Sequence, residues 1–143
     1  MIELTRRYRF SASHRLHAAA LSDGENRELY GKCNNPHGHG HDFVLEVRVR
    51  GAIDPETGLA ADVRKLDALV QRRVLADFHM KNLNTQVPAF AEVVPTSENV
   101  TREIERRLCG SWREAFPSNQ PALGGIRLIE TRKNAFESGR RGE

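Results

Sequence analysis

The sequence predicts an α+β fold, in which strands pair into an antiparallel sheet and helices cover one face of that sheet. Polar and apolar residues alternate at residues 2–13 and 41–53, as they do in strands. Apolar residues then follow helical spacing over 63–78 and again after residue 96. Residues 124–139 return to strand character, as one or two strands. This order keeps strand pairs apart from helices, which is typical of antiparallel α+β domains.

The clearest strand is the segment HDFVLEVRVRGAI at residues 41–53. Alternate side chains of a strand point to opposite faces, so one face of this segment is apolar and the other is charged. The apolar face comprises Phe43, Leu45, Val47 and Val49. The sequence DPETG at 54–58 predicts a turn directly after this strand.

The two helical segments differ in how clearly they begin. The first, over 63–78, is recognised by the spacing of its apolar residues alone. The second can be capped by Thr96 or Ser97, whose side chains can accept a hydrogen bond from the first turn. Residues 18–38 and 80–95 contain glycine, asparagine and proline, and we expect both to be loops.

Length and charge narrow the class of protein. The chain has 143 residues, which fits one domain spanning residues 1–143. The net charge is +3 and the arginine pairs are scattered, so a solvated surface is the first interpretation and an anionic small-molecule substrate is the second. We expect no nucleic-acid partner. Two cysteines are too few for a disulfide framework. Neither a signal peptide nor a long apolar run is visible, so we expect a cytoplasmic protein with no membrane partner.

A cluster of histidines lies in the segment CNNPHGHGHDF, at residues 33–43. His39 and His41 are two residues apart at the start of the clearest strand, so their rings can converge on one point. Imidazole suits zinc, and three histidines with one open position are typical of a catalytic zinc site. We expect the third ligand to be His14, at the end of the first strand, with His17 and His37 as the alternatives.

Cys33 has two possible roles beside these histidines. It could be a fourth metal ligand, which would close a structural site. It could instead be a reactive thiol beside an open metal position. The pair His39 and His41 also has a plain interpretation, because surface strands carry such pairs by chance.

Six segments together resemble the family of 6-pyruvoyl-tetrahydropterin synthase and 6-carboxy-tetrahydropterin synthase. In chain order they are FSASHRL, CNNPHGHGHDF, IDPETG after a glycine, KNLN followed by VP, PTSENV and IETRKN. The resemblance covers residues 4 to about 138, nearly the whole chain. The combination is specific, although no single segment would be.

The resemblance implies the tunnelling fold, with a four-stranded antiparallel sheet and two helices on one face. It implies a homo-oligomer, a trimer or a hexamer, with sites between subunits. The activity would be that of a zinc-dependent lyase that removes triphosphate from 7,8-dihydroneopterin triphosphate and yields 6-pyruvoyl-tetrahydropterin. The alternatives are a 6-carboxy-tetrahydropterin synthase of queuosine biosynthesis, a variant that cleaves the side chain, and a pterin-binding protein without turnover.

The resemblance also assigns roles to residues of this chain. The zinc ligands would be His14, His39 and His41, and the catalytic cysteine would be Cys33. Glu130 would anchor the pterin ring, and the pterin pocket would be lined by Thr96, Ser97 and Glu98. The resemblance does not assign the residues that bind the triphosphate; Lys32 and Arg15 are candidates because they are basic and close to the site in the sequence, although solvated surface side chains are the more common case.

The sequence departs from the family in one segment that bears on the chemistry. The family carries an aspartate and a histidine in DHKNL, where this chain has His79 and Met80 in HMKNL. Methionine cannot transfer a proton at neutral pH. We therefore take His79 as the candidate for the second proton-transferring residue.

Overall fold

The computed structural model describes residues 1–139 and is built on one sheet with the strand order β3-β1-β2-β4-β5. The strands are β1 (Ile2–His14), β2 (His39–Gly51), β3 (Lys81–Asn82), β4 (Ala122–Ile129) and β5 (Ala135–Ser138). All neighbours are antiparallel except β3, which pairs in parallel with β1. The α+β prediction is confirmed, but the sheet has five strands instead of four. The additional strand, β3, is too short to show an alternating pattern.

The long pairing of β1 with β2 positions the histidines. Phe10 lies opposite Phe43 in this pairing, and His14 lies opposite His39. Side chains two residues apart share a face, so His41 lies on the same face as these four residues. One end of the sheet therefore carries a layer of imidazoles next to a layer of phenyl rings.

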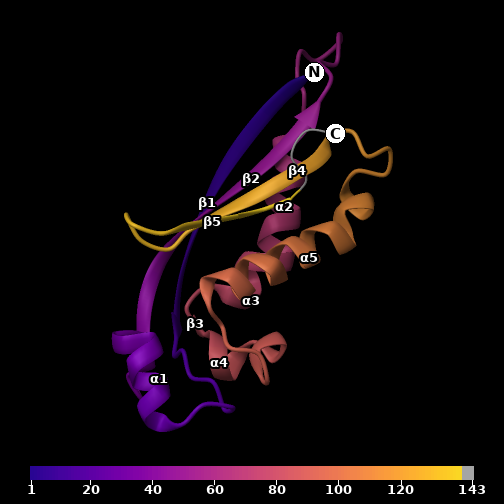
Figure 1. Ribbon diagram of the computed structural model, residues 1–143. Coiled ribbons are helices and arrows are strands. Elements are labelled where there is room, and N and C mark those ends of the chain that lie inside the picture. Colours follow the sequence, from indigo (N-terminus) through magenta and orange to yellow (C-terminus); the bar gives the residue numbers. More distant parts are fainter. Residues whose placement is uncertain (140–143) are drawn as a thin grey trace.

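Helices cover this face of the sheet (Figure 1). One is nearly continuous: α2 (Val63–Val70) passes through a π-helical turn (Gln71–Leu75) into α3 (Ala76–Phe78). The other is α5 (Ser97–Ala115), and the side chain of Thr96 caps it by accepting from the backbone N–H of Asn99. Both helices were predicted from the sequence, and the cap is one of the two proposed residues.

The prediction of a loop over 18–38 is wrong, because the segment contains α1 (Asp23–Tyr30) and a 3₁₀ turn (Gly31–Asn34). Ser22 and Glu25 form a capping box at the start of α1. The only buried side chain of α1 is Asn26, which hydrogen-bonds to backbone atoms of Ala18 and Leu21. Polar contacts hold this helix, so it lacks the apolar periodicity by which helices are recognised.

The second predicted loop, 80–95, is also partly regular. It contains β3, a short helix α4 (Leu83–Gln86) and a 3₁₀ turn (Pro88–Phe90). The side chain of Asn82 caps α4 by accepting from the backbone N–H of Asn84. These elements are each shorter than two helical turns, and so they leave no clear period in the sequence.

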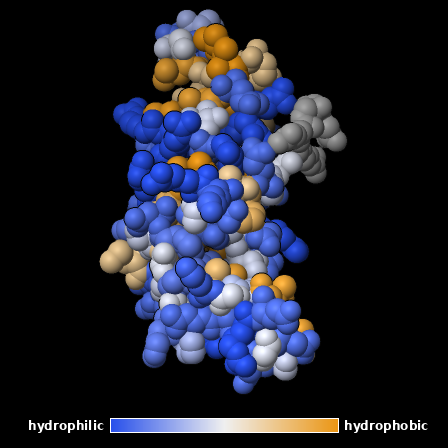
Figure 2. Space-filling view, turned by 60° about the vertical axis from the view of Figure 1, so that its left-hand side comes forward, coloured by the Kyte–Doolittle hydropathy of each residue, from blue (hydrophilic) through white to orange (hydrophobic). Residues whose placement is uncertain are grey.

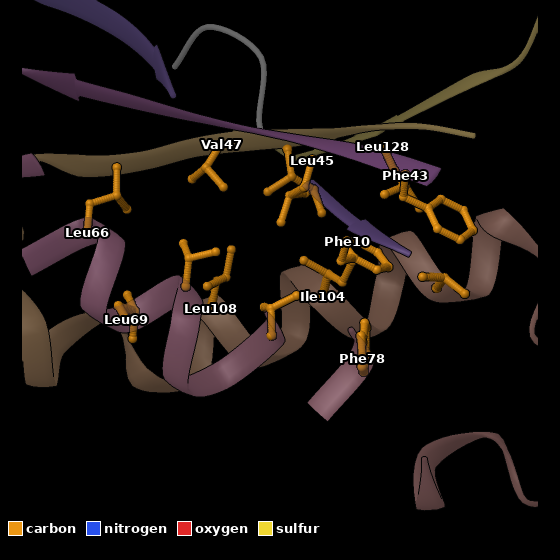
Figure 3. Close-up of a cluster of buried hydrophobic side chains, with 14 of the residues drawn as sticks. Phe10, Phe43, Leu45, Val47, Leu66, Leu69, Phe78, Ile104, Leu108 and Leu128 are labelled. Carbon is orange, nitrogen blue, oxygen red and sulfur yellow. The ribbon is translucent and has the colours of Figure 1, made fainter. Parts of the chain in front are cut away.

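The hydrophobic core lies between the sheet and the helices α2, α3 and α5 (Figure 3). The rings of Phe10 and Phe43 stack with their centroids 5.0 Å apart, and Phe78 of α3 packs edge-on against Phe10 at 5.9 Å. The ring of His41 lies 5.5 Å from that of Phe43. The histidine rings therefore pack directly on the hydrophobic core, whose close packing restricts their movement.

The surface is mostly hydrophilic, with apolar side chains gathered at the end of the molecule that holds the N-terminus (Figure 2). The exposed apolar residues of the N-terminus and of the segment after β2 are Met1, Ile2, Ile53 and Leu59. Among residues 1–139, no helix is both long and apolar enough to cross a membrane.

Candidate active site

Three imidazoles meet at the end of the sheet. His14 comes from the last position of β1, and His39 and His41 come from the first residues of β2. One ligand nitrogen from each of these histidines lies within 4.8 Å of the other two. The rings stand nearly edge to face, with centroids 4.7–5.1 Å apart. The antiparallel register and the spacing of two residues produce this convergence, as the sequence predicts.

The separations fit a metal ion. The Nε2 atoms of His14 and His39 are 3.2 Å apart. Two nitrogens that bind one tetrahedral zinc ion at about 2.0–2.1 Å lie about 3.3 Å from each other. The Nε2 atom of His41 is buried and has no hydrogen-bond partner in the part of the chain described. A buried polar atom without a partner is costly, and a metal ion among the three rings would satisfy it.

The orientation of His14 is fixed by the loop before α5. Its Nδ1 donates a hydrogen bond of 2.8 Å to the backbone carbonyl of Pro95, and the side chain is 2% exposed. This bond leaves the Nε2 lone pair directed at the other rings. Metal-binding histidines usually have such a partner for the second nitrogen, because it fixes the tautomer and the ring plane.

The electrostatics keep two of these rings neutral. Burial lowers the pKa of His14 against the raising effect of its bond to Pro95, and the charges of His39 and His41 lower it further. Burial and the charge of His41 lower the pKa of His39. A neutral imidazole is the form that binds a metal, so these shifts favour metal binding at neutral pH.

Glu130 lies beside the histidines, just after β4. Its Oε2 accepts a hydrogen bond from the hydroxyl of Ser97, the first residue of α5, and its Oε1 is 4.0 Å from Nε2 of His41. The side chain of Glu130 is 14% exposed and Ser97 is 2% exposed. Within residues 1–139, Oε1 of Glu130 accepts no hydrogen bond, so this nearly buried carboxylate is suited to bind a ligand that presents N–H groups.

Cys33 lies in the 3₁₀ turn after α1 and is partly buried. Burial raises the pKa of its thiol, and the charge of Glu130 raises it further. The protonated thiol is therefore the favoured form in the metal-free protein. A cation among the histidines would act in the opposite direction and favour the thiolate.

The other candidate residues are less closely grouped. Thr96 caps α5, and Glu98 is exposed on its first turn. His79 is exposed, and its Nδ1 accepts a hydrogen bond of 3.1 Å from the backbone N–H of Ser11 in β1. Met80 follows with a backbone φ of 60° and is 75% exposed. The structure therefore links His79 to β1, which lies next to the edge strand β3, and within residues 1–139 it shows no contact of His79 with Cys33.

The alternative histidines have other partners. His17 accepts from the side-chain amide of Asn34 at 3.0 Å, and His37 is exposed. The carbonyl of Pro95 is the part of the site that the sequence did not reveal. It lies 81 residues from His14, and a backbone acceptor leaves no signal in residue type.

Comparison with known proteins shows the family. Residues 3–140 match the family described as 6-pyruvoyl tetrahydropterin synthase. The chain belongs to this family. It is 45% identical over 131 residues to the 6-pyruvoyl tetrahydrobiopterin synthase of Poecilia reticulata, covering 92% of this chain and 85% of that protein. It is 48% identical over 98 residues to the Homo sapiens protein of the same name, covering 68% of each.

The fold agrees with this membership. The structure of Caenorhabditis elegans 6-pyruvoyl tetrahydropterin synthase superposes with a TM-score of 0.85 at 38% identity, covering 97% of this chain and 95% of that one. The resemblance of the sequence to this family is thereby confirmed.

Proposed function

We propose that the protein is a zinc-dependent lyase that converts 7,8-dihydroneopterin triphosphate into 6-pyruvoyl-tetrahydropterin and triphosphate. The observation that carries the proposal is the convergence of three imidazoles beside a nearly buried carboxylate at one end of the sheet. Cys33 lies in the adjacent turn, where its backbone carbonyl accepts a hydrogen bond from the backbone N–H of Leu16, just after β1. The names of the relatives support the same reaction.

The pterin ring would be recognised by Glu130. A carboxylate can accept two hydrogen bonds from the guanidine-like edge of a pterin, and charge-assisted bonds of this kind are strong and directional. Ser97 holds the carboxylate in place by donating to one of its oxygens. Thr96 and Glu98 flank Ser97 at the start of α5, where they would line the pocket.

The metal would be held by His14, His39 and His41, whose ligand nitrogens lie within 4.8 Å of one another. The Nε2 atoms of His14 and His39 lie 3.2 Å apart, which is the separation expected for two ligands of one zinc ion. A bound zinc ion would supply a Lewis acid for the side-chain oxygens of the substrate. The chain supplies the neutral imidazoles that bind the ion, and the bond from His14 to Pro95 fixes one of them.

Cys33 would move protons at the substrate's side-chain carbons. Elimination breaks one C–H bond and one C–O bond, and the triphosphate leaves with the electrons of the C–O bond. The hydroxyl-bearing carbons become carbonyls while the pterin ring is reduced, so no external oxidant is required. His79 is the candidate for a second proton carrier, because its Nε2 remains free while Nδ1 is bonded to Ser11.

The oligomeric state belongs to the proposal as well. We expect a trimer or a hexamer, because β3 and β5 are short strands at the edges of the sheet and their outer backbone groups can pair with another chain. The exposed apolar residues near the N-terminus offer a further surface for association. A single domain over residues 1–143 and a cytoplasmic location remain predictions.

The reaction can be tested by incubating the purified protein with 7,8-dihydroneopterin triphosphate and identifying products by mass. The proposal predicts equal amounts of triphosphate and 6-pyruvoyl-tetrahydropterin, and it predicts that Cys33→Ala loses at least about 100-fold in kcat. A 6-carboxy or 6-hydroxymethyl product would contradict it.

A second candidate is a pterin-binding protein without turnover, which is favoured by the exposed Met80 at the position of the family's histidine. Tight binding of substrate with no product over many hours would support this candidate over the synthase.

A further inference from the structure

A hollow of about 710 Å³ opens beside the histidine site, and His39 forms part of its wall. Cationic side chains come into it from three places: Arg15 follows β1, Arg27 lies on α1, and Lys32 lies in the 3₁₀ turn. Its one carboxylate is that of Asp23. This volume is within the range of small-molecule pockets, and the wall carries an excess of positive charge.

Two of the cations are chain neighbours of residues in the candidate active site. Arg15 directly follows His14, and Lys32 directly precedes Cys33. The third, Arg27, was missed in the sequence because its segment was expected to be a loop. The helix α1 places Arg27 in the same hollow as the other two.

Arg15 is held in position before any ligand binds. Its backbone N–H donates to the side chain of Asn84 at 2.7 Å, and its carbonyl accepts from the same amide at 2.9 Å. Its Nε donates to the carbonyl of Asn34 at 3.2 Å. The two terminal nitrogens of the guanidinium remain available, and a side chain that is already ordered loses little entropy on binding.

The three cations lack acidic partners within residues 1–139. No salt bridge joins Arg15, Arg27 or Lys32 to a carboxylate, whereas at least one is formed by each of Arg6, Arg7, Arg48, Arg106 and Arg107. Their charges are therefore not neutralised by the protein itself. A polyanion in the hollow would meet three cations at once.

We propose that this hollow binds the triphosphate group of the substrate and that Arg27 helps to position it there. The inference rests on the proposed function. It also sets the direction in which the substrate lies: the pterin ring at Glu130, the reacting carbons at the histidines and Cys33, and the phosphates along α1. The leaving triphosphate gains negative charge as its C–O bond breaks, so these cations stabilise departure as well as binding.

Binding of inorganic tripolyphosphate, measured by calorimetry at two salt concentrations, tests the hollow without any turnover. Arg27→Gln combined with Lys32→Gln removes two exposed cations and should weaken binding by at least about tenfold. The matched control is Arg64→Gln combined with Lys65→Gln on α2, which removes the same charge elsewhere and should change binding less than about twofold.

If both double variants lose the same amount of tripolyphosphate affinity, only the net charge of the protein matters. If both bind tripolyphosphate as tightly as the unaltered protein, the hollow is not the binding site. Either result overturns the proposal.

Turnover separates this inference from the proposed function. If the synthase reaction occurs but KM for 7,8-dihydroneopterin triphosphate is the same in both double variants, the hollow is wrong and the function stands. If tripolyphosphate binds as predicted but no product forms, the hollow stands and the function is wrong.

Discussion

Replacing Glu130 by glutamine tests the pterin anchor with little change in shape. The carboxylate is 14% exposed, and one of its oxygens accepts from Ser97. Two hydrogen bonds from a pterin to a charged acceptor contribute about 1.5–3 kcal/mol each, against about 0.5–1.5 kcal/mol for a neutral one. The difference over two bonds is about 2–3 kcal/mol, which corresponds to a Kd about 30–150 times higher.

The assay is calorimetric titration with a pterin that lacks phosphate, so that the hollow along α1 does not contribute. Ser97→Ala keeps the carboxylate but removes the bond that holds it, and should raise Kd by about 3–10-fold. Glu92→Gln, on an exposed loop, is the control and should have no effect. Metal content should be the same in all variants, because the proposed ligands are imidazoles. A Kd for Glu130→Gln within twofold of the unaltered protein would refute the anchor.

Three further predictions concern reactivity, stability and the departure from the family. In a variant in which Cys109 is replaced by serine, iodoacetamide should alkylate Cys33 slowly in the metal-free protein, because the pKa of its thiol is raised. The alkylation should become faster once zinc is added, and equal rates with and without zinc would contradict this electrostatic explanation. Asp67 accepts two hydrogen bonds of 2.8 Å from Arg6, which lowers its pKa. A carboxyl group whose pKa is lowered by folding stabilises the protein at pH values above its unfolded pKa, which is about 3.9. Because the side chain is 39% exposed, Asp67→Asn should lower the free energy of unfolding by only about 1 kcal/mol at pH 7, as measured by urea unfolding. This difference should shrink progressively as the pH falls below about 3.9 and the carboxylate is protonated. The double variant with His79→Asp and Met80→His restores the family's order of residues and should raise kcat if the natural site is slow. If kcat falls both in this double variant and in His79→Ala, then His79 already transfers the proton.

The parts of the fold that were predicted correctly carry local signals. The alternation in β2 and the position of Thr96 before α5 both depend on neighbouring residues, and both are confirmed. The convergence of His14 with His39 and His41 needed one further assumption, that β1 and β2 are adjacent and antiparallel. Consecutive strands are often neighbours in a sheet, and here they pair although residues 15–38, including α1, lie between them.

The parts that were missed depend on distant or polar contacts. Helix α1 is organised around the buried Asn26 instead of an apolar face, and β3 exists because two residues pair with β1. The bond from His14 to Pro95 joins residues 81 positions apart through a backbone oxygen. Residue types along the chain contain no record of such contacts, so the hollow with Arg27 was not expected either.

The central claim is that three imidazoles form the metal centre while Cys33 remains free for proton transfer. X-ray absorption at the zinc edge of the purified protein measures this directly, because nitrogen and sulfur ligands differ in distance. The account predicts about one zinc per chain with nitrogen ligands at about 2.0–2.1 Å and no sulfur, and it predicts loss of the metal in a His39→Ala and His41→Ala double variant. A sulfur ligand at about 2.3 Å would make Cys33 part of a closed structural site and would contradict the account.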